Sequence, residues 1–274
     1  MKTKVRAAAE VAGRPVQPAP ALSTGWAIGL PVLRIGLVAV VSVLTWGVVQ
    51  LIEPGVAFPP PSLLASFAML PVNLVCLFLI GRLLRRSGSS IRELLGFDRR
   101  RLGRDLAQGV LWLLVLYLPF VGTILLVTWL QHGAELFVRM QTIFFDPAAV
   151  PTLNPVAWTV IGVVTALTFA PLNAPAEELL YRGVSQGALA RRFPVVLAVL
   201  IPSVLFGLQH LWYAATPDAV VTFVCAFFVW GVGSGLIYLR QRRLMPLVLA
   251  HGLVDLVFTL PALALTFLMA GQGG

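Results

Sequence analysis

The sequence predicts an all-α fold: a polytopic transmembrane helical bundle with about seven to eight membrane helices. Of its 274 residues, 58% are hydrophobic and the mean hydropathy is +0.90. Only 11% are charged, whereas a soluble domain would be roughly a quarter charged. The apolar runs are continuous over about 17–25 residues, the length that spans hydrocarbon as a helix. They do not alternate as barrel strands do, so the backbone must be satisfied within helices.

Seven apolar runs account for most of the chain and predict the membrane helices. Before them, residues 1–24 are rich in Pro and Ala and predict a disordered cytoplasmic tail. Residues 25–274 then form a single integral membrane domain, in which Arg34 lies close enough to the start of the first run to snorkel. Residues 132–150 mix aromatic and charged side chains, which favours an interfacial helix. The runs are residues 26–52, 62–80, 106–130, 156–172, 194–212, 219–239 and 245–269.

The basic residues predict the orientation of the chain. The net charge is +9, and all but two of the 20 basic residues are arginines. They lie in short segments between apolar runs, most densely in residues 82–104, which is the positive-inside pattern of a multi-pass protein with its N-terminus inside. This placement argues against nucleic acid as a partner and for the lipid bilayer. Arginine over lysine, with much Ala, Val and Leu, favours a bacterial cytoplasmic membrane.

Glu177, Glu178 and Arg182 form an ionisable cluster between apolar runs. Charged groups at membrane depth are costly and mark functional sites by default. Glu178 and Arg182 are four residues apart, so they share a helix face and can pair. Glu177 points about 100° away and has no partner at helical spacing. A desolvated carboxylate without a counter-charge is a stronger base, so we expect Glu177 to do chemistry. The flanking Pro171 and Pro175 predict an interruption of the helix just before the pair.

Two of the three histidines, His210 and His251, also lie within apolar runs. Asp255 follows His251 by one helical turn and can accept one ring N–H, which fixes the tautomer and raises the basicity of the other nitrogen. Taken singly, each histidine suits a hydrogen-bonded packing role, and Phe206 beside His210 suits packing. Taken together, buried polar groups must find one another, which predicts one shared site.

If the helices were straight and perpendicular to the membrane, His210 and His251 would lie at different depths in it. His210 lies about 27 Å along a straight helix after Arg192, whereas His251 lies only about 12 Å after Arg243. Helix tilt, a kink at Pro202 or a fifth helix that begins outside the hydrocarbon are the alternatives. In the next run, Gly231-x-x-x-Gly235 predicts the close approach of a neighbouring helix.

Three motifs in order resemble those of the CPBP intramembrane proteases. They are Glu-Glu-x-x-x-Arg from Glu177, Phe-x-x-x-His from Phe206, and His-x-x-x-Asp from His251, where the family has Asn or Asp. This family includes the type II CAAX prenyl endopeptidases and the bacteriocin-processing or self-immunity proteins called Abi. The resemblance covers a family-like catalytic core of about residues 94–265. No single motif is specific, but the ordered set is.

The resemblance implies an endopeptidase that hydrolyses a peptide bond inside the membrane, near its cytoplasmic face. The substrate would be a membrane-associated peptide or protein cut near a terminus, such as a prenylated CAAX-type or bacteriocin-like one. Glu177 would activate the water, supported by Glu178 and Arg182. His210 and His251 would contact the water, the oxyanion or a metal. The last family position is often Asn, a possible oxyanion donor, whereas Asp255 suits the orientation of His251.

The resemblance also raises the question of a metal, because the family is commonly described as metalloproteases. The sequence has no His-Glu-x-x-His motif. A zinc ion would need ligands from separate helices, namely His210, His251 and Glu177, with one position left for water. In the metal-free alternative, Glu177 is the base and the histidines stabilise the oxyanion. The residues favour the metal-free alternative slightly.

Two other functions suit the same residues. Buried Glu, Arg and His side chains also build relays in transporters and proton-coupled carriers. A catalytically silent immunity or scaffold member of the family would keep the motifs without cleaving a peptide. A carrier predicts solute flux, whereas a protease predicts a peptide product.

Overall fold

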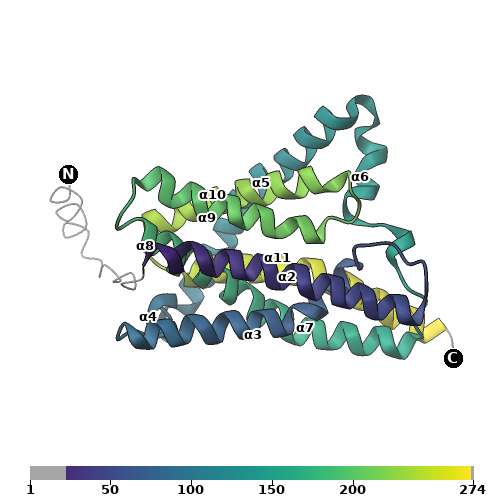
Figure 1. Cartoon of the computed structure of the whole chain (residues 1–274), viewed down its shortest axis with the longest axis horizontal. Coiled ribbons are helices and arrows are strands. Elements are labelled where there is room, and N and C mark those ends of the chain that lie inside the picture. The colour runs from purple at the N-terminus through teal and green to yellow at the C-terminus, as the bar shows by residue number, and fades with distance from the viewer. Residues whose placement is uncertain (1–22, 273–274) are drawn as a thin grey trace.

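The computed structural model describes residues 23–272, with side chains described as far as Thr259. The tail predicted for residues 1–24 falls almost wholly outside the described residues. All the regular elements between residues 23 and 272 are helical, and they pack into one elongated bundle (Figure 1). The predicted helical membrane bundle is therefore confirmed.

Seven long helices form the bundle within residues 23–272. Six of them are long and apolar enough to cross a membrane, and the described part of α11 adds a shorter apolar helix. The long helices are α2 (Thr24–Ile52), α3 (Ser62–Arg86), α5 (Leu102–His132), α7 (Pro155–Glu178), α9 (Val195–Gln209), α10 (Ala219–Gln241) and α11 (Met245–Gln272). The short ones are α4 (Ile91–Leu95), α6 (Leu136–Phe144) and α8 (Gly187–Leu189).

The arginine-bearing loops meet at one end of the bundle, which we call the arginine-rich end (residues 82–104, 190–194 and 240–244). The Arg243 guanidinium pairs with Asp105 at 2.6 Å and donates to the Gly96 carbonyl at 3.1 Å. Arg192 donates to the Thr24 hydroxyl at 2.9 Å, which fixes the start of α2 at the same end. Figure 1 shows α4 and α8 at this end and α6 towards the other. All the arginine-rich loops predicted to share a side do so.

The helix that carries the acidic pair differs from its prediction. Asn154 caps α7 by accepting from the Ala157 amide at 2.8 Å, and α7 then continues through Pro171 and Pro175 to Glu178. The predicted interruption is wrong, because neighbouring helices in a membrane bundle can accommodate the groups that a proline leaves unpaired. The chain instead widens into a π-helix, η4 (Leu179–Gln186), directly after the acidic pair. Wide π turns are frequent at functional sites.

The glycines of α10 allow helices to pack at close range, as the sequence predicted. A Cβ atom on Gly231 would lie 3.0 Å from the Ser203 Cα of α9, and one on Gly235 would lie 3.0 Å from Gln186 Oε1. Gly207 of α9 faces α10 even more closely, because its Cβ would lie 2.6 Å from the Val224 carbonyl oxygen. The contact between α9 and α10 therefore depends on small residues from both helices.

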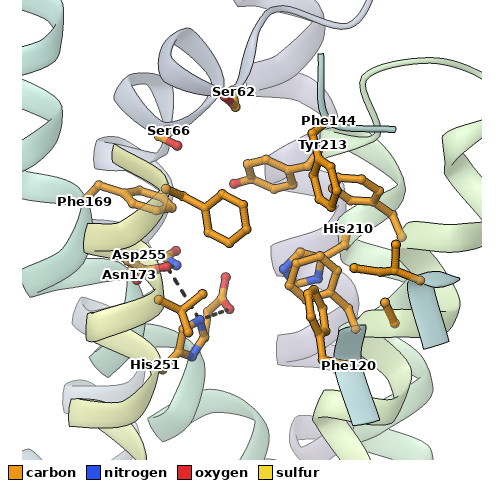
Figure 2. A pocket seen from close by; sticks show the side chains of 17 residues that line it. Ser62, Ser66, Phe120, Phe144, Phe169, Asn173, His210, Tyr213, His251 and Asp255 are labelled. Carbon is orange, nitrogen blue, oxygen red and sulfur yellow. Dashed lines mark hydrogen bonds and ion pairs between the residues drawn. The ribbon is translucent and has the colours of Figure 1, made fainter. Parts of the chain in front are cut away.

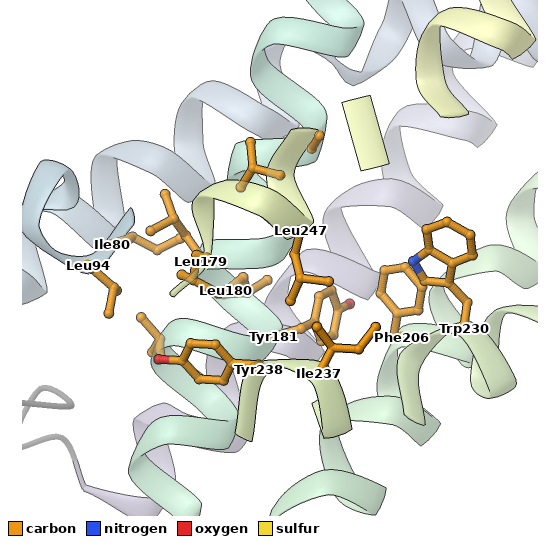
Figure 3. Packing of buried hydrophobic residues seen from close by; sticks show 14 of the residues in the cluster. Ile80, Leu94, Leu179, Leu180, Tyr181, Phe206, Trp230, Ile237, Tyr238 and Leu247 are labelled. Atoms are coloured by element: carbon orange, nitrogen blue, oxygen red, sulfur yellow. The ribbon is translucent and has the colours of Figure 1, made fainter. Parts of the chain in front are cut away.

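A cluster of buried apolar side chains fills the bundle between η4 and the arginine-rich end, and we call it the apolar plug (Figure 3). Gly183 sits tightly inside it, because a Cβ there would lie 2.9 Å from Leu94 and 3.0 Å from Leu244. Buried cores are close-packed in general, so this cluster leaves little room for a path through this end. Its members are Ile80, Leu84, Leu94, Leu179, Leu180, Ile237, Tyr238, Leu244 and Leu247.

Candidate active site

A cavity of about 130 Å³ lies within the bundle, with polar groups at its floor and aromatic rings around its walls (Figure 2). It is lined by residues of α3, α5, α6, α7, α10 and α11 and by the turn that follows α9. The polar groups at the floor are Asn173, Glu177, His210, His251 and Asp255. The aromatic rings of the walls are Phe120, Phe144, Phe169, Tyr213, Phe223, Phe227 and Phe258.

Glu177 is held by two hydrogen bonds to one of its carboxylate oxygens. Arg34 Nη2 donates to Glu177 Oε1 at 2.8 Å, and Gln209 Nε2 donates to the same oxygen at 2.7 Å. Arg34 does not snorkel as predicted: its side chain is 0% exposed and lies in the bundle interior. The expectation that Glu177 lacks a counter-charge is therefore wrong. The guanidinium stabilises the ionised carboxylate, which is the form that a general base needs.

The other oxygen of Glu177 remains available. Among the described residues, Glu177 Oε2 has no hydrogen-bond partner. It lies 3.6 Å from His251 Nε2, which is longer than a hydrogen bond. Because Glu177 and His251 both line the cavity, a water at the floor can hydrogen-bond to both groups. This buried oxygen is an unpaired acceptor of the kind that acid–base chemistry requires.

Glu178 is buried, and it is not among the side chains that line the cavity. Its Oε1 lies 3.0 Å from His251 Nδ1 and 3.4 Å from Arg182 Nη1. The pairing of Glu178 with Arg182, predicted from their spacing, is confirmed. The Arg182 guanidinium also lies over the Phe206 ring, 4.4 Å from its centroid, a favourable position for a cation on a ring face.

His251 is oriented by Glu178. A carboxylate oxygen can only accept, so Nδ1 carries the proton in that hydrogen bond, and Nε2 is left for the cavity. The sequence assigned this orienting contact to Asp255. The structure places Asp255 Oδ1 3.8 Å from His251 Nε2, on the cavity side of the ring, while Asn173 Nδ2 donates to Asp255 Oδ2 at 3.4 Å. Asp255 therefore lies near Nε2, the ring nitrogen on the cavity side, whereas Glu178 accepts the hydrogen bond from Nδ1.

His210 reaches the same cavity from the other side of the floor. Its Nδ1 lies 2.7 Å from the Phe206 carbonyl oxygen, which can only accept, so Nδ1 is the donor. The ring stacks on Phe227 with centroids 3.5 Å apart and planes 8° apart. These two contacts fix the ring and leave Nε2 as its remaining hydrogen-bonding atom. The two histidines thus share one site although His210 follows the whole of α9 and His251 lies near the start of α11.

Three residues of the site were missed in the sequence: Arg34, Asn173 and Gln209. Gln209 connects the others, because its Oε1 accepts from Arg34 Nε at 2.8 Å and from the Tyr181 hydroxyl at 2.9 Å. Asn173 Oδ1 accepts from Arg34 Nη2 at 2.9 Å. The available signal was Arg34 itself, a lone arginine several residues inside an apolar run, where burial has to be compensated by a partner.

A metal ion fits the described side chains poorly. Among them, no group of three or more His, Cys, Asp or Glu is arranged to hold one. The guanidinium of Arg34 lies against Glu177, so a metal bound by this carboxylate would face a like charge at close range. The ligand set predicted from His210, His251 and Glu177 is not assembled in this arrangement.

The fold and the site together define a class: a multi-pass helical membrane protein with acid–base groups gathered at the floor of an internal cavity. Comparison with known protein families adds one match. Residues 156–257 match the sequence model of the family described as type II CAAX prenyl endopeptidase Rce1-like. This region of the chain is similar to that family, which supports the resemblance carried by the three motifs. Comparisons with curated proteins and with solved structures found no match.

The matched region runs from α7 to α11 and includes Glu177, Glu178, Arg182, His210, His251 and Asp255. It supports a CAAX-type intramembrane protease as the general class of the chain. Arg34 belongs to α2 and lies outside the matched residues. The contact of Arg34 with Glu177 therefore connects the family domain to the part of the chain that the match does not cover.

Proposed function

We propose that the chain is an intramembrane endopeptidase that cuts a membrane-associated substrate by Glu177-activated attack of water. The observation that carries this proposal is the carboxylate of Glu177 at the cavity floor. One of its oxygens is held by Arg34 and Gln209, and the other has no hydrogen-bond partner among the described residues and lies 3.6 Å from His251 Nε2. A positioned base of this kind typically contributes about 10²–10⁴-fold to a rate.

In the proposed reaction, Glu177 Oε2 takes a proton from water while the water oxygen attacks the carbonyl carbon of the scissile peptide bond. The carbonyl oxygen becomes an oxyanion, which His251 Nε2 or His210 Nε2 stabilises as a hydrogen-bond donor when it carries a proton. The proton on Glu177 then passes to the peptide nitrogen, the C–N bond breaks, and a carboxylic acid and an amine are released. Atoms balance with water as the only co-reactant, and this sequence of steps needs no metal.

The other polar groups hold this arrangement. Arg34 and Gln209 fix the carboxylate of Glu177, and Glu178 fixes the ring of His251 with Arg182 as its counter-charge. We assign Asp255 to the cavity side of His251, where it can hydrogen-bond to the substrate or to a bound water. Removal of one member of a buried ion pair leaves the other charge without a partner, which is costly. The Arg34–Glu177 pair and the Glu178–Arg182 pair therefore each act as a unit.

The walls of the cavity suit an apolar group beside the scissile bond. Aromatic rings from five α-helices and from the turn after α9 line it, and such walls favour a bulky apolar side chain or an apolar lipid chain. A prenylated CAAX-type protein and a bacteriocin-like peptide, each cut near a terminus, both present such a group. We also propose that the chain lies in a bacterial cytoplasmic membrane with its N-terminus and its arginine-rich end inside, because of the positive-inside pattern.

The test is peptide cleavage by the purified full-length chain in lipid nanodiscs. A panel of membrane-anchored peptides, including farnesylated CAAX peptides, is incubated in water enriched in ¹⁸O, and the products are identified by mass spectrometry. The protease predicts one ¹⁸O atom in the new carboxyl group and loss of the product in Glu177→Gln. The matched control is Asp98→Asn, which lies far from the cavity and in which the amide oxygen can still accept from the Arg100 amide as Asp98 does.

Retained cleavage by Glu177→Gln would refute the assignment of the base. Wild-type protein that yields no product from any peptide, but moves solute across liposomes in an ion-dependent manner, would favour a carrier instead. Binding of a peptide without cleavage, unchanged in Glu177→Gln, would favour the catalytically silent alternative.

A further inference from the structure

We propose that the cavity takes its substrate from the side of the membrane opposite the arginine-rich end, which is the outer side. This inference builds on the proposed function and names a substrate class: a peptide segment exposed on the outer face of the membrane. It differs from the cytoplasmic access that the family resemblance implies. Three observations carry it: an open end of the cavity, a closed end, and the distribution of charge between them.

The open end of the cavity lies away from the arginine-rich loops. Ser62, the first residue of α3, lines the cavity and is exposed. The 25 residues of α3 end in Arg85 and Arg86, so Ser62 stands about 37 Å along the helix from the arginine-rich end. Figure 2 shows Ser62, Phe144 and Tyr213 at one side of the cavity and His251 at the other.

Two aromatic side chains of the cavity lining are partly exposed. Phe144 of α6 is 39% exposed and Phe258 of α11 is 45% exposed, although both line the cavity. α6 lies between the end of α5 and the start of α7, at the end opposite the arginine-rich loops. A substrate that passes Ser62 and Phe144 meets aromatic walls first and the polar floor afterwards.

The opposite end of the cavity is closed by the apolar plug. Leu179 and Leu180 follow the acidic pair directly, Leu247 lies one turn before His251, and all three are almost completely buried. Figure 3 shows these side chains packed together with Ile237 and Tyr238. A peptide from the arginine-rich end would have to displace a close-packed core to reach Glu177.

The charge distribution identifies the closed end with the cytoplasm. Residues 82–104 alone contain eight arginines against two acidic residues. The other end carries Glu53, Glu135, Asp146 and Asp218 with only one arginine, Arg139, in its loops. Positively charged loops stay inside, so the open end of the cavity is the outer one. The active groups lie within the bundle but are reached from outside.

This geometry narrows the class of substrate that can reach the cavity. A prenylated C-terminus on the cytoplasmic face would meet the apolar plug and not the open end of the cavity. An exported peptide, or a membrane protein with an apolar segment near a terminus on the outer face, meets Ser62 and the aromatic walls directly. We therefore assign the cavity to outer-face peptides with an apolar residue next to the cut.

Thiol labelling tests access without reference to catalysis. The two native cysteines, Cys76 and Cys225, are replaced by alanine, and Ser66→Cys places a thiol in the cavity wall. Ser87→Cys, exposed at the arginine-rich end, is the matched control. Sealed spheroplasts and inverted membrane vesicles are each treated with a charged, membrane-impermeant methanethiosulfonate reagent. Because a fixed charge crosses hydrocarbon poorly, we expect Ser66→Cys to label at least about tenfold faster than Ser87→Cys in spheroplasts, with the opposite ratio in inverted vesicles.

Labelling of Ser66→Cys only in inverted vesicles, or in the same preparation as Ser87→Cys, would overturn the inference. Ser62→Cys at the mouth provides a second variant if Ser66→Cys does not fold, and the same two results apply to it. The pattern should persist in Glu177→Gln, because access does not depend on the base.

The two proposals can fail separately. Outer labelling with no peptide product from any substrate would leave access intact and refute the protease. Inner labelling with normal cleavage would refute outer access and leave the protease intact. If both hold, the reagent added to spheroplasts should block cleavage of an externally added apolar peptide by Ser66→Cys and leave Ser87→Cys unaffected.

Discussion

Glu177 and Glu178 are adjacent in the chain yet have different surroundings. Glu177 faces the cavity, with a guanidinium from a distant helix on one oxygen and no hydrogen-bond partner among the described residues on the other. Glu178 points into the protein, between Arg182 and His251. A rotation of about 100° per residue accounts for the difference. Neighbouring residues of the same type can thus meet separate cations, and in the proposed mechanism Glu177 is chemical and Glu178 supporting.

The two pairs also differ in how they are assembled. Glu178 and Arg182 lie on successive turns of one helical segment, so local geometry is enough to bring them together. Glu177 and Arg34 belong to α7 and α2, and only the packing of the bundle joins them. The pair that depends on packing is the one whose loss should disturb the fold most.

The largest expected effect is on stability, in Arg34→Met. This change leaves the Glu177 carboxylate buried without its cation, and removal of one partner of a buried pair costs about 3–5 kcal/mol. Chemical unfolding of the purified chain in detergent, followed by tryptophan fluorescence, measures the loss. Arg34→Met combined with Glu177→Leu should recover most of it, because no charge is then left unpaired. A double variant no more stable than Arg34→Met would show that the two side chains are not coupled.

Glu178→Gln should have a smaller effect, on the turnover number. The amide can still accept from His251 Nδ1, but it no longer pairs with Arg182, so the ring is held less firmly. Loss of an orienting partner of this kind typically lowers activity by about 10–100-fold. Steady-state cleavage of the best peptide gives kcat and KM separately, and the decrease should appear in kcat. A decrease confined to KM would place Glu178 in substrate binding.

Asp255→Asn should change the rate by less than about tenfold, because a side-chain amide can hydrogen-bond as acceptor and donor at the same place. Asp255→Ala removes both possibilities and should be slower than Asp255→Asn. The comparison of the two variants in the same cleavage assay separates hydrogen bonding from charge. Wild-type rates for both variants would indicate that Asp255 takes no part in the reaction.

Removal of metal should have the smallest effect. Because the described side chains present no assembled set of metal ligands, we expect the cleavage rate to stay within about twofold after dialysis against a chelator, since the proposed base needs no metal to act. Inactivation that zinc reverses would contradict the metal-free mechanism and would require Arg34 to move away from Glu177.

The sequence predicted those features that depend on local pattern. Hydropathy and run length predicted the membrane helices, spacing predicted the Glu178–Arg182 pair, and Gly231 and Gly235 predicted a close helix contact. The histidines were assigned to one site because isolated polar groups are costly in an apolar interior. Each of these inferences needs only residues within one helix or a general cost of burial.

The remaining features depend on packing between distant segments. Arg34 looked like a side chain that snorkels, because nothing local reveals that α2 packs against α9 and η4. Pro171 and Pro175 looked like helix breaks, because the neighbours that accommodate them belong to other helices. Glu178 took the orienting role assigned to Asp255 because His251 packs against the end of α7. Contacts between distant segments therefore determine the partners of these side chains and the continuity of α7.

The most direct test of the account compares kcat for Glu177→Gln with kcat for Glu178→Gln on the same peptide in the same lipid. Both changes remove one buried negative charge at adjacent positions, so they are matched in chemistry. The account predicts that Glu177→Gln is slower than wild type by about 10³-fold or more, within the range for a lost general base, and at least about tenfold slower than Glu178→Gln. Equal losses, or a greater loss in Glu178→Gln, would contradict the assignment of Glu177 as the group that activates water.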